Sequence, residues 1–353
     1  MRAITVIPHQ AGSVRLEERP DPSVDDGHAL IRALALGVCG TDREIVAGDY
    51  GWAPEGEDRL ILGHESLGQV VHAPAGSGLE EGELVVGIVR RPDPVPCQAC
   101  AGGEWDMCRN GLYTERGIKQ RHGYGAELYP LGPEHAIKVD PRLGILGVLL
   151  EPSSILAKAW DHVERIGARS RTWAPRKVLV TGAGPVGLLG AMMARQRGLE
   201  THVLDRVTDG PKPQLVRDLG ATYHPGPLSI IAELKPDVVI ECTGADAVVL
   251  DAIQNAATDG IVCLTGVSSG GRSVRFDVGG FNCEAVLGNE VVFGSVNANR
   301  THFEAAAQAL AKADRAWLSR VISRRVPLDR WQEAFQRQPD DVKVVIDFAA
   351  GAS

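Results

Sequence analysis

The stretch from Val178 to Asp205 constrains this chain more than any other part of its sequence. An apolar run at 178–180 leads into the glycine pattern GAGPVG at 182–187, which is followed by an apolar segment of helical period and a second strand-like run. Glycines at these positions permit a tight turn and let backbone N–H groups approach a pyrophosphate at the helix N-terminus. The order of strand, glycine turn, helix and strand therefore predicts a dinucleotide-binding site.

Asp205, at the end of the second strand, indicates which dinucleotide to expect. It lies 18 residues past Gly187, where a carboxylate can accept hydrogen bonds from the adenosine ribose hydroxyls. The same carboxylate repels the 2′-phosphate of NADP, whereas the neighbouring Arg206 can bind that phosphate. We expect NAD as the preferred cofactor and NADP as the alternative.

Length and charge limit the classes of protein to consider. A chain of 353 residues exceeds a comfortable single core, so two domains are expected. The net charge of −8 and the absence of a basic run argue against nucleic acid or anionic membranes as partners. The first ten residues do not resemble a signal peptide, and the sequence offers no run of ~18 uninterrupted apolar residues. We therefore expect a soluble, cytoplasmic protein.

Two patterns divide the chain. From Met1 to about Pro141, short β-branched runs broken by Gly, Pro and Asp predict a β-rich domain. From Lys177 to about Ser295, near-continuous apolar strands alternate with helical segments, as in a parallel sheet covered on both faces. The predicted fold is α/β, with residues 1–155 and 296–353 in a catalytic domain and 156–295 in a doubly wound dinucleotide-binding domain.

The cysteines point to metal chemistry. Seven cysteines, an odd number without an export signal, argue for thiols or metal ligands rather than a disulfide framework. Cys39 in GVCGTD and His64 in GHESLG supply a thiolate and an imidazole, which are good zinc ligands. Glu151 in LLEP can supply a third ligand. The HExxG pattern lacks the second histidine of a metalloprotease, so zinc hydrolase chemistry is not expected.

These motifs give the chain a resemblance to the zinc-dependent medium-chain dehydrogenases over nearly its whole length. It is more specifically similar to their glucose 1-dehydrogenase branch through VRRP at 89–92, ERGI at 115–118 with HGY at 122–124, and GSVN at 294–297 before HFE at 302–304. The resemblance implies a GroES-like catalytic domain and a Rossmann domain. It also implies that zinc acts as a Lewis acid while hydride passes from C1 of an aldose, D-glucose being expected, to NAD(P), giving a lactone.

The resemblance also implies roles for individual residues. The catalytic zinc is expected on Cys39, His64 and Glu151, with Glu65 as a ligand or exchange partner. The residues expected around the substrate are Thr41, Glu115, Glu151, Ile155 and Asn297. Thr41 is further expected to relay the departing proton. The residues expected at the cofactor are Gly182, Gly184, Pro185, Val186, Gly187, Asp205, Arg206, Thr265, Gly266, Val267, Ser295, Val296, Asn297 and Lys343.

Two positions depart from the family pattern. Ile155 stands where some members have an aspartate, which puts the choice of sugar in question. Cys97, Cys100 and Cys108 provide three of the four ligands of the family's lobe zinc, and the missing ligand falls at Pro94. Asp93 can complete the site with its carboxylate. We expect a bound structural zinc, the alternative being an emptied site that keeps three thiols.

Two other functions remain open from the sequence. One is a dehydrogenase for another polyol or a secondary alcohol. The other is a non-catalytic sensor that uses the dinucleotide-binding sheet, although nothing in a sensor requires a Lewis acid. The substrate is expected to be a small sugar or alcohol. The resemblance implies a homodimer or homotetramer that joins dinucleotide-binding sheets edge to edge.

Overall fold

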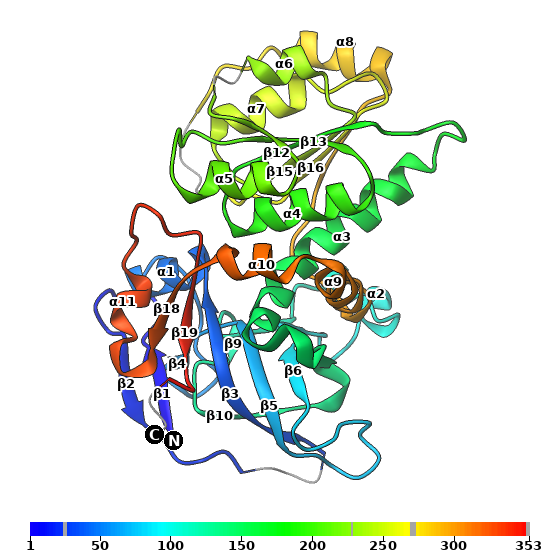
Figure 1. Cartoon of the computed structure of the whole chain (residues 1–353). Coiled ribbons are helices and arrows are strands. Elements are labelled where there is room, and N and C mark those ends of the chain that lie inside the picture. The colour runs from blue at the N-terminus through cyan, green and yellow to red at the C-terminus, as the bar shows by residue number, and fades with distance from the viewer. Residues whose placement is uncertain (24–26, 227–228, 269–272, 351–353) are drawn as a thin grey trace. The chain divides into compact units, whose positions relative to one another are not determined.

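A computed structural model of the chain describes residues 1–23, 27–226, 229–268 and 273–350. Contacts within the chain separate two compact units, Met1–Ser154 with Asn297–Ser353, and Ile155–Val296. The expected division lay after residues 155 and 295, one residue from each of these boundaries. Figure 1 shows the chain with its elements labelled.

The first unit, called the catalytic unit below, consists mainly of strands. Its strands are β1 (Arg2–Val6), β2 (Arg15–Glu18), β3 (Ala29–Val38), β4 (Leu60–Ile61), β5 (Glu65–His72), β6 (Leu84–Gly87), β7 (Arg90–Arg91), β8 (Thr114–Arg116), β9 (Gln120–Arg121), β10 (Leu128–Leu131), β11 (Ala136–Lys138), β18 (Ile322–Pro327) and β19 (Lys343–Asp347). Its α-helices are α1 (Gly40–Ala47), α2 (Gln98–Ala101), α9 (Arg300–Lys312), α10 (Arg315–Val321) and α11 (Gln332–Phe335). Its 3-10 turns are η1 (Trp105–Met107), η2 (Pro133–His135), η3 (Pro141–Leu149) and η4 (Leu328–Arg330).

The main sheet of the catalytic unit has the order β11-β6-β5-β3-β19-β18, and β10 also pairs with β3. Strand β3 lies in the middle because its alternating apolar residues are buried, with Ile31 and Ala35 almost fully covered. The C-terminal strand β19 pairs antiparallel with β3, which places Val344 opposite Val38. This pairing brings the end of the chain next to the GVCGTD loop.

The second unit, called the nucleotide unit below, alternates strands and helices. Its elements are α3 (Leu150–Gly167, which begins in the catalytic unit), β12 (Lys177–Thr181), α4 (Pro185–Gln196), β13 (Glu200–Leu204), α5 (Pro211–Asp218), β14 (Thr222–His224), α6 (Ile230–Leu234), β15 (Val238–Glu241), α7 (Asp246–Gln254), β16 (Ile261–Leu264), α8 (Val278–Gly288) and β17 (Val291–Gly294).

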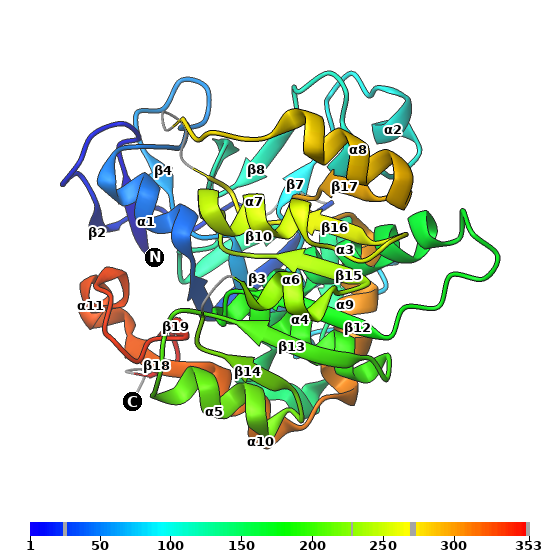
Figure 2. The same cartoon turned by 90° about the horizontal axis from the view of Figure 1, so that it is seen from above.

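All strands of this sheet run parallel in the order β14-β13-β12-β15-β16-β17, which Figure 2 shows side by side. Helices α4 and α5 cover one face, and α6 and α7 cover the other (Figure 1). Apolar residues from four strands and two helices fill the second face, including Leu179, Val239 and Ile231. The order reverses between β12 and β15, and such a switch point is where ligands bind in open α/β sheets. The predicted fold class is confirmed.

One segment, Pro141–Gly167, is long and apolar enough to cross a membrane by length and composition. However, 83% of its most apolar window is buried inside the protein, as in the core helix of a globular chain. The segment is also not one continuous helix, because Gly144 has non-helical dihedral angles.

Candidate metal centres and cofactor site

The first candidate metal centre lies in the catalytic unit, at the N-terminus of α1. Cys39 precedes the helix, and its Sγ lies 3.0 Å from Nε2 of His64, which precedes β5. Ligand atoms of Cys39, His64 and Glu65 all lie within 4.8 Å of one another. A thiolate, an imidazole and a carboxylate at this spacing form a donor set suited to zinc.

Asp42 holds the other side of the histidine ring. Its buried carboxylate accepts a hydrogen bond from the Cys39 backbone N–H at 2.9 Å, and its Oδ1 lies 3.3 Å from Nδ1 of His64. Burial alone would lower the pKa of His64, but the Cys39 sulfur and the Asp42 carboxylate outweigh it and raise that pKa well above its ordinary value. A carboxylate behind a metal-binding histidine fixes which ring nitrogen faces the metal.

Lys343 of β19 fixes the neighbouring acid. Its fully buried ammonium donates to both oxygens of Glu65, at 2.7 and 2.6 Å, and to the Val38 carbonyl at 3.3 Å. Lys343 thus binds Glu65 in this structure. The expected contact of Lys343 with the cofactor stays a prediction. The sequence did not reveal this ion pair, whose members are 278 residues apart.

Glu151 lies in the first turn of α3, outside the group of ligand atoms within 4.8 Å. Burial raises its pKa to about 7, and the charges of His64 and Glu65 also act on it. The charges of this centre therefore influence the pKa of Glu151. The role of Glu151 as a zinc ligand stays a prediction.

A second polar group of the catalytic unit surrounds Glu115 on β8. The buried Glu115 carboxylate accepts hydrogen bonds from Nε and Nη2 of Arg90, at 3.1 and 2.9 Å, and from Nδ2 of Asn297 at 2.7 Å. Arg90 in turn stacks over the Tyr113 ring at 3.7 Å. Glu115 and Asn297, which are 182 residues apart, are thus brought together, and Arg90 is the partner that the sequence did not reveal.

Two other residues expected at the substrate lie on helices. Thr41 lies half-buried in the first turn of α1, two residues from Cys39. Ile155 lies half-buried on α3, one turn after Glu151. Their contact with a substrate stays a prediction.

In the nucleotide unit, the glycine turn has the geometry that a dinucleotide requires. Gly182 has a φ of +90°, and a Cβ at Gly187 would lie 1.8 Å from the Gly182 carbonyl oxygen. Gly184 caps α4, with Pro185 and Val186 in the first turn. A Cβ at Gly184 would meet open space among the described residues, which leaves room for a phosphate at the helix N-terminus. These residues fit a bound dinucleotide.

Asp205 is anchored to this turn. Its Oδ2 accepts a hydrogen bond from the Ala183 N–H at 2.6 Å, its Oδ1 accepts one from the Val207 N–H at 3.2 Å, and Lys212 lies 3.8 Å away. The next residue, Arg206, is exposed. The carboxylate is thus positioned directly after β13, with the exposed guanidinium side chain of Arg206 beside it.

The remaining residues expected at the cofactor follow β16 and β17. Thr265 and Gly266 donate their backbone N–H groups to the Glu241 carbonyl, at 2.8 and 3.0 Å. Val267 and Val296 are exposed, whereas the Ser295 hydroxyl oxygen is buried with no hydrogen-bond partner in the described chain.

Two buried charges, on Glu241 and Lys158, support this edge of the sheet. The fully buried Glu241 carboxylate accepts hydrogen bonds from the N–H groups of Thr243 and Gly244, at 2.7 and 3.2 Å. The Lys158 ammonium donates to the Val296 carbonyl at 3.0 Å. Neither role was predicted, although an acid directly after the apolar run 238–240 was a usable signal.

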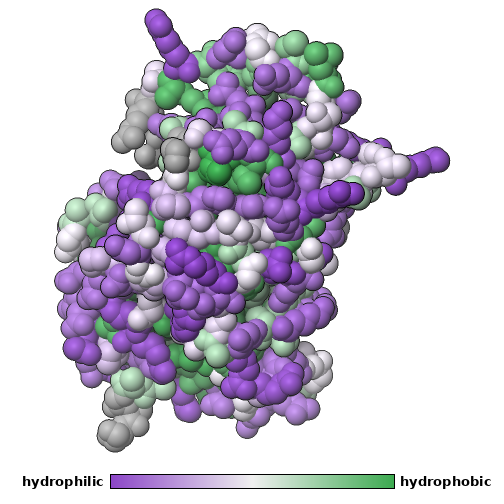
Figure 3. Space-filling view, turned by 45° about the horizontal axis from the view of Figure 1, so that its top comes forward, coloured by the Kyte–Doolittle hydropathy of each residue, from purple (hydrophilic) through white to green (hydrophobic). Residues whose placement is uncertain are grey.

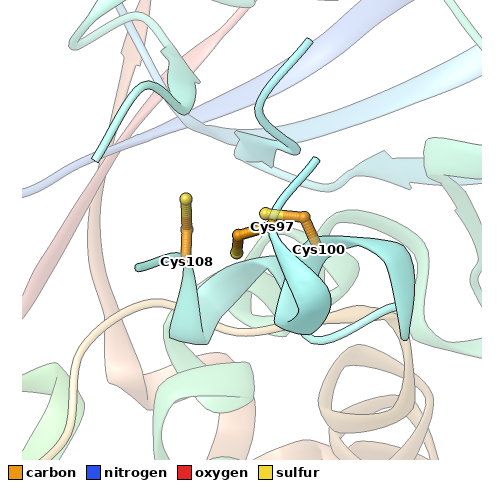
Figure 4. A group of neighbouring side chains, drawn as sticks. All are labelled: Cys97, Cys100 and Cys108. Atoms are coloured by element: carbon orange, nitrogen blue, oxygen red, sulfur yellow. The ribbon is translucent and has the colours of Figure 1, made fainter. Parts of the chain in front are cut away.

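The second candidate metal centre is the cysteine lobe, formed by Cys97, Cys100 and Cys108 around α2 and η1. Their sulfur atoms lie within 4.8 Å of one another, and Figure 4 shows the three side chains gathered there. The Arg109 N–H beside its sulfur lowers the pKa of Cys97 to about 6, while burial raises that of Cys100 to about 11.

Asp93 precedes this lobe and is almost fully buried. Its Oδ1 accepts a hydrogen bond from the Val95 N–H at 2.9 Å, while its Oδ2 is buried without a hydrogen-bond partner within the described ranges. An unpaired buried carboxylate oxygen is costly, and a metal ion would satisfy it. The three sulfur atoms fit a zinc ion, whereas Asp93 lies outside the group of ligand atoms within 4.8 Å, and its role as the fourth ligand stays a prediction.

Models of known protein families match both the N-terminal and the C-terminal part of the chain. Residues 25–141 match the model of the alcohol dehydrogenase GroES-like domain, and residues 144–348 match that of the glucose dehydrogenase C-terminus. Glucose 1-dehydrogenase of Methanocella arvoryzae is 40% identical, with 99% of this chain and 100% of that protein covered. Glucose 1-dehydrogenase of Thermoproteus tenax is 41% identical, with 98% of this chain and 99% of that one covered.

Among solved structures, the chain is similar to Haloferax mediterranei glucose dehydrogenase in complex with NADP, zinc and gluconolactone. The TM-score is 0.92 and the sequence identity 34%, and 99% of each chain is covered.

Proposed function

The chain belongs to the glucose dehydrogenase family of zinc-dependent medium-chain dehydrogenases, and from this we propose that it oxidises C1 of an aldose, D-glucose above all, to the lactone. The observation that carries the proposal is the Cys39–His64 pair, whose sulfur and Nε2 atoms lie 3.0 Å apart in the same unit as the Glu115 polar group. Sensors need no such pair, so the enzyme assignment replaces the sensor alternative.

Cys39 and His64 would hold the catalytic zinc, with Glu151 as third ligand and Glu65 as ligand or exchange partner. Bound zinc supplies a Lewis acid that acidifies the substrate hydroxyl, and bound NAD(P) supplies the hydride acceptor. Asp42 keeps Nε2 of His64 directed at Cys39, because it occupies the Nδ1 side of the ring. Lys343 holds the Glu65 carboxylate by two short hydrogen bonds and so opposes its movement.

Thr41 and Glu115 would act on the substrate itself. The Thr41 hydroxyl, two residues from Cys39, passes the hydroxyl proton toward solvent as a relay, because an ordinary hydroxyl is too weak a base to retain it. Glu115 and Asn297 hydrogen-bond sugar hydroxyls, and the hydrogen bonds from Arg90 hold the Glu115 carboxylate in place. A site that hydrogen-bonds hydroxyls discriminates strongly against analogues that lack them.

Cofactor preference is the second part of the proposal. Asp205, anchored at the glycine turn, accepts hydrogen bonds from the ribose diol of NAD and repels the 2′-phosphate of NADP. Arg206 recovers part of the NADP affinity through its guanidinium. We expect both cofactors to support turnover, with NAD preferred.

We further propose that Cys97, Cys100 and Cys108, with Asp93, hold a structural zinc. The unpartnered Oδ2 of Asp93 and the closely grouped sulfur atoms support this assignment. A closed site of four protein ligands would stabilise the lobe without taking part in the reaction.

Association into a homodimer or homotetramer and a cytoplasmic location complete the proposal. Strand β17 is the last strand of its sheet, and Val292 on it is exposed. Figure 3 shows hydrophobic side chains gathered over α8, where Val278, Val286 and Leu287 are 66%, 65% and 76% exposed. An exposed apolar patch beside an open sheet edge supports an interface between subunits. All seven cysteines are free in the described chain, which suits a reducing compartment.

A panel of initial rates tests the proposal. The zinc-loaded protein is assayed with NAD and with NADP over aldoses, polyols and secondary alcohols, and the lactone is identified as product. We expect D-glucose to be among the best substrates. The apolar Ile155 favours a second candidate, oxidation of a less polar polyol or secondary alcohol. Turnover of these alone, without any aldose, would contradict the proposal.

A further inference from the structure

Two aromatic side chains are exposed on the loop that follows α1. Tyr50 is 38% and Trp52 is 41% exposed, and their rings form a T-shaped contact with centroids 5.0 Å apart. The His9 ring lies edge-on to Trp52 at 6.0 Å. Each of these large rings can bury considerable apolar area against a ligand.

The backbone between the two rings is rigidly held. Gly51 is buried with a φ of +98°, and a Cβ there would lie only 3.1 Å from Cγ1 of Ile45. The Trp52 N–H donates to the Ile118 carbonyl at 2.9 Å, and the Trp52 carbonyl accepts from the Gln120 N–H at 3.0 Å. The rings are therefore presented by a fixed loop, which lowers the entropy lost when a ligand binds.

The loop borders the polar group around Glu115. Trp52 is bonded to Ile118, in the turn that follows β8, and to Gln120, which begins β9 and pairs with Glu115. Burial raises the pKa of the Tyr50 hydroxyl, and the negative charge of Glu115 is the next largest cause of this shift. The aromatic pair and the hydrogen-bonding group thus adjoin one another within the catalytic unit.

The pair is also displaced from the metal ligands along the chain. Helix α1 begins directly after Cys39 and has eight residues, so it carries the chain about 12 Å before the loop begins. A single sugar ring whose C1 lies at the metal is shorter than this helix. A second ring attached to the first would extend over the loop.

We propose that Tyr50 and Trp52 form a subsite for the second ring of a reducing disaccharide, whose reducing ring is bound by Glu115 and Asn297. The C–H face of a pyranose carries partial positive charge and packs on the electron-rich face of an aromatic ring. The inference rests on the proposed function and extends its substrate class. The reaction is unchanged: the C1–H hydride passes to NAD(P)⁺, the C1 hydroxyl proton is released, and a disaccharide lactone forms.

Steady-state kinetics with D-glucose, cellobiose and maltose test the subsite. We expect the wild type to oxidise at least one of the two disaccharides. Trp52→Ala should lower the ratio of kcat/KM for that disaccharide to kcat/KM for glucose about tenfold, and Trp52→Phe should restore most of it. Leu112→Ala, which removes an exposed apolar side chain outside the pair, is the matched control and should leave the ratio unchanged.

The outcomes separate the two proposals. Glucose oxidation without turnover of either disaccharide, or a Trp52→Ala variant with an unchanged ratio, would overturn the subsite while leaving the proposed function intact. No turnover of any aldose by the zinc-loaded enzyme would overturn the proposed function itself. Thermal unfolding of Trp52→Ala at the wild-type temperature shows that a changed ratio does not come from a damaged fold.

Discussion

The two ring nitrogens of His64 have different partners, because Nδ1 lies 3.3 Å from the buried Asp42 carboxylate while Nε2 lies 3.0 Å from Cys39 Sγ. Removing the negative charge of Asp42 should weaken the orientation and basicity of the imidazole. We expect Asp42→Asn to lower zinc affinity 10- to 100-fold, as loss of such partners typically does. Competition with a zinc chelator measures this. Asp49→Asn, at an exposed position, is the control, and equal affinities of the two variants would disprove the role of Asp42.

The cysteine lobe should raise the metal content of the enzyme. If both proposed sites are filled, elemental analysis gives about two zinc ions per subunit, one from an open and one from a closed site. Cys100→Ser should lose one of them and unfold at a lower temperature. Cys283→Ser, at an exposed cysteine, should keep both. A wild-type content of one, unchanged by Cys100→Ser, would show that the lobe binds no zinc.

Asp205 should determine the cofactor preference. Two unit charges about 4 Å apart repel by on the order of 1 kcal/mol in water and by more in a partly closed site. A factor of ten corresponds to 1.4 kcal/mol, so we expect NAD to be favoured about tenfold or more in kcat/KM. Asp205→Ser should relax or reverse this preference, whereas Asp209→Ser, at an exposed residue, should not. A wild type that works better with NADP would mean that Arg206 outweighs the carboxylate.

His135 should make the fold sensitive to acid. Burial, followed by the charge of Arg91, lowers the pKa of His135 to about 4, below its ordinary value of 6.5. Between these values the unfolded chain binds more protons, so stability falls as the pH drops from about 6.5 to about 4.

The loss in the free energy of unfolding reaches on the order of 3 kcal/mol once the pH falls to about 4, and His135→Gln should reduce this loss. Urea unfolding at several pH values measures this effect. His72→Gln is the control, because the His72 side chain is 60% exposed. The same slope of stability against pH in wild type and His135→Gln would refute the assignment.

The sequence predicted features that depend on local pattern. The glycine turn, the parallel sheet and the separation into two units follow from runs of neighbouring residues, such as 178–187. Cys39 and His64 were recognisable because each lies in its own short motif, and the structure brings them together across the β3–β5 pairing.

Contacts between distant residues could not be predicted in the same way. Lys343 binds Glu65 because β19 pairs with β3, and Arg90 binds Glu115 because β7 pairs with β8. Neither pairing leaves a local signal in the sequence. Asp42 was visible in GVCGTD, but its role depends on burial against His64, which only the folded chain defines.

We expect zinc held by Cys39 and His64 to be required for oxidation of an aldose. The most direct measurement is the rate of glucose oxidation by the enzyme after chelation and after zinc is restored, with Cys39→Ala measured in parallel. We predict that the metal-free enzyme and Cys39→Ala lose turnover while still folding and binding NAD, and that zinc restores only the wild type. Undiminished glucose oxidation by metal-free Cys39→Ala would contradict the claim.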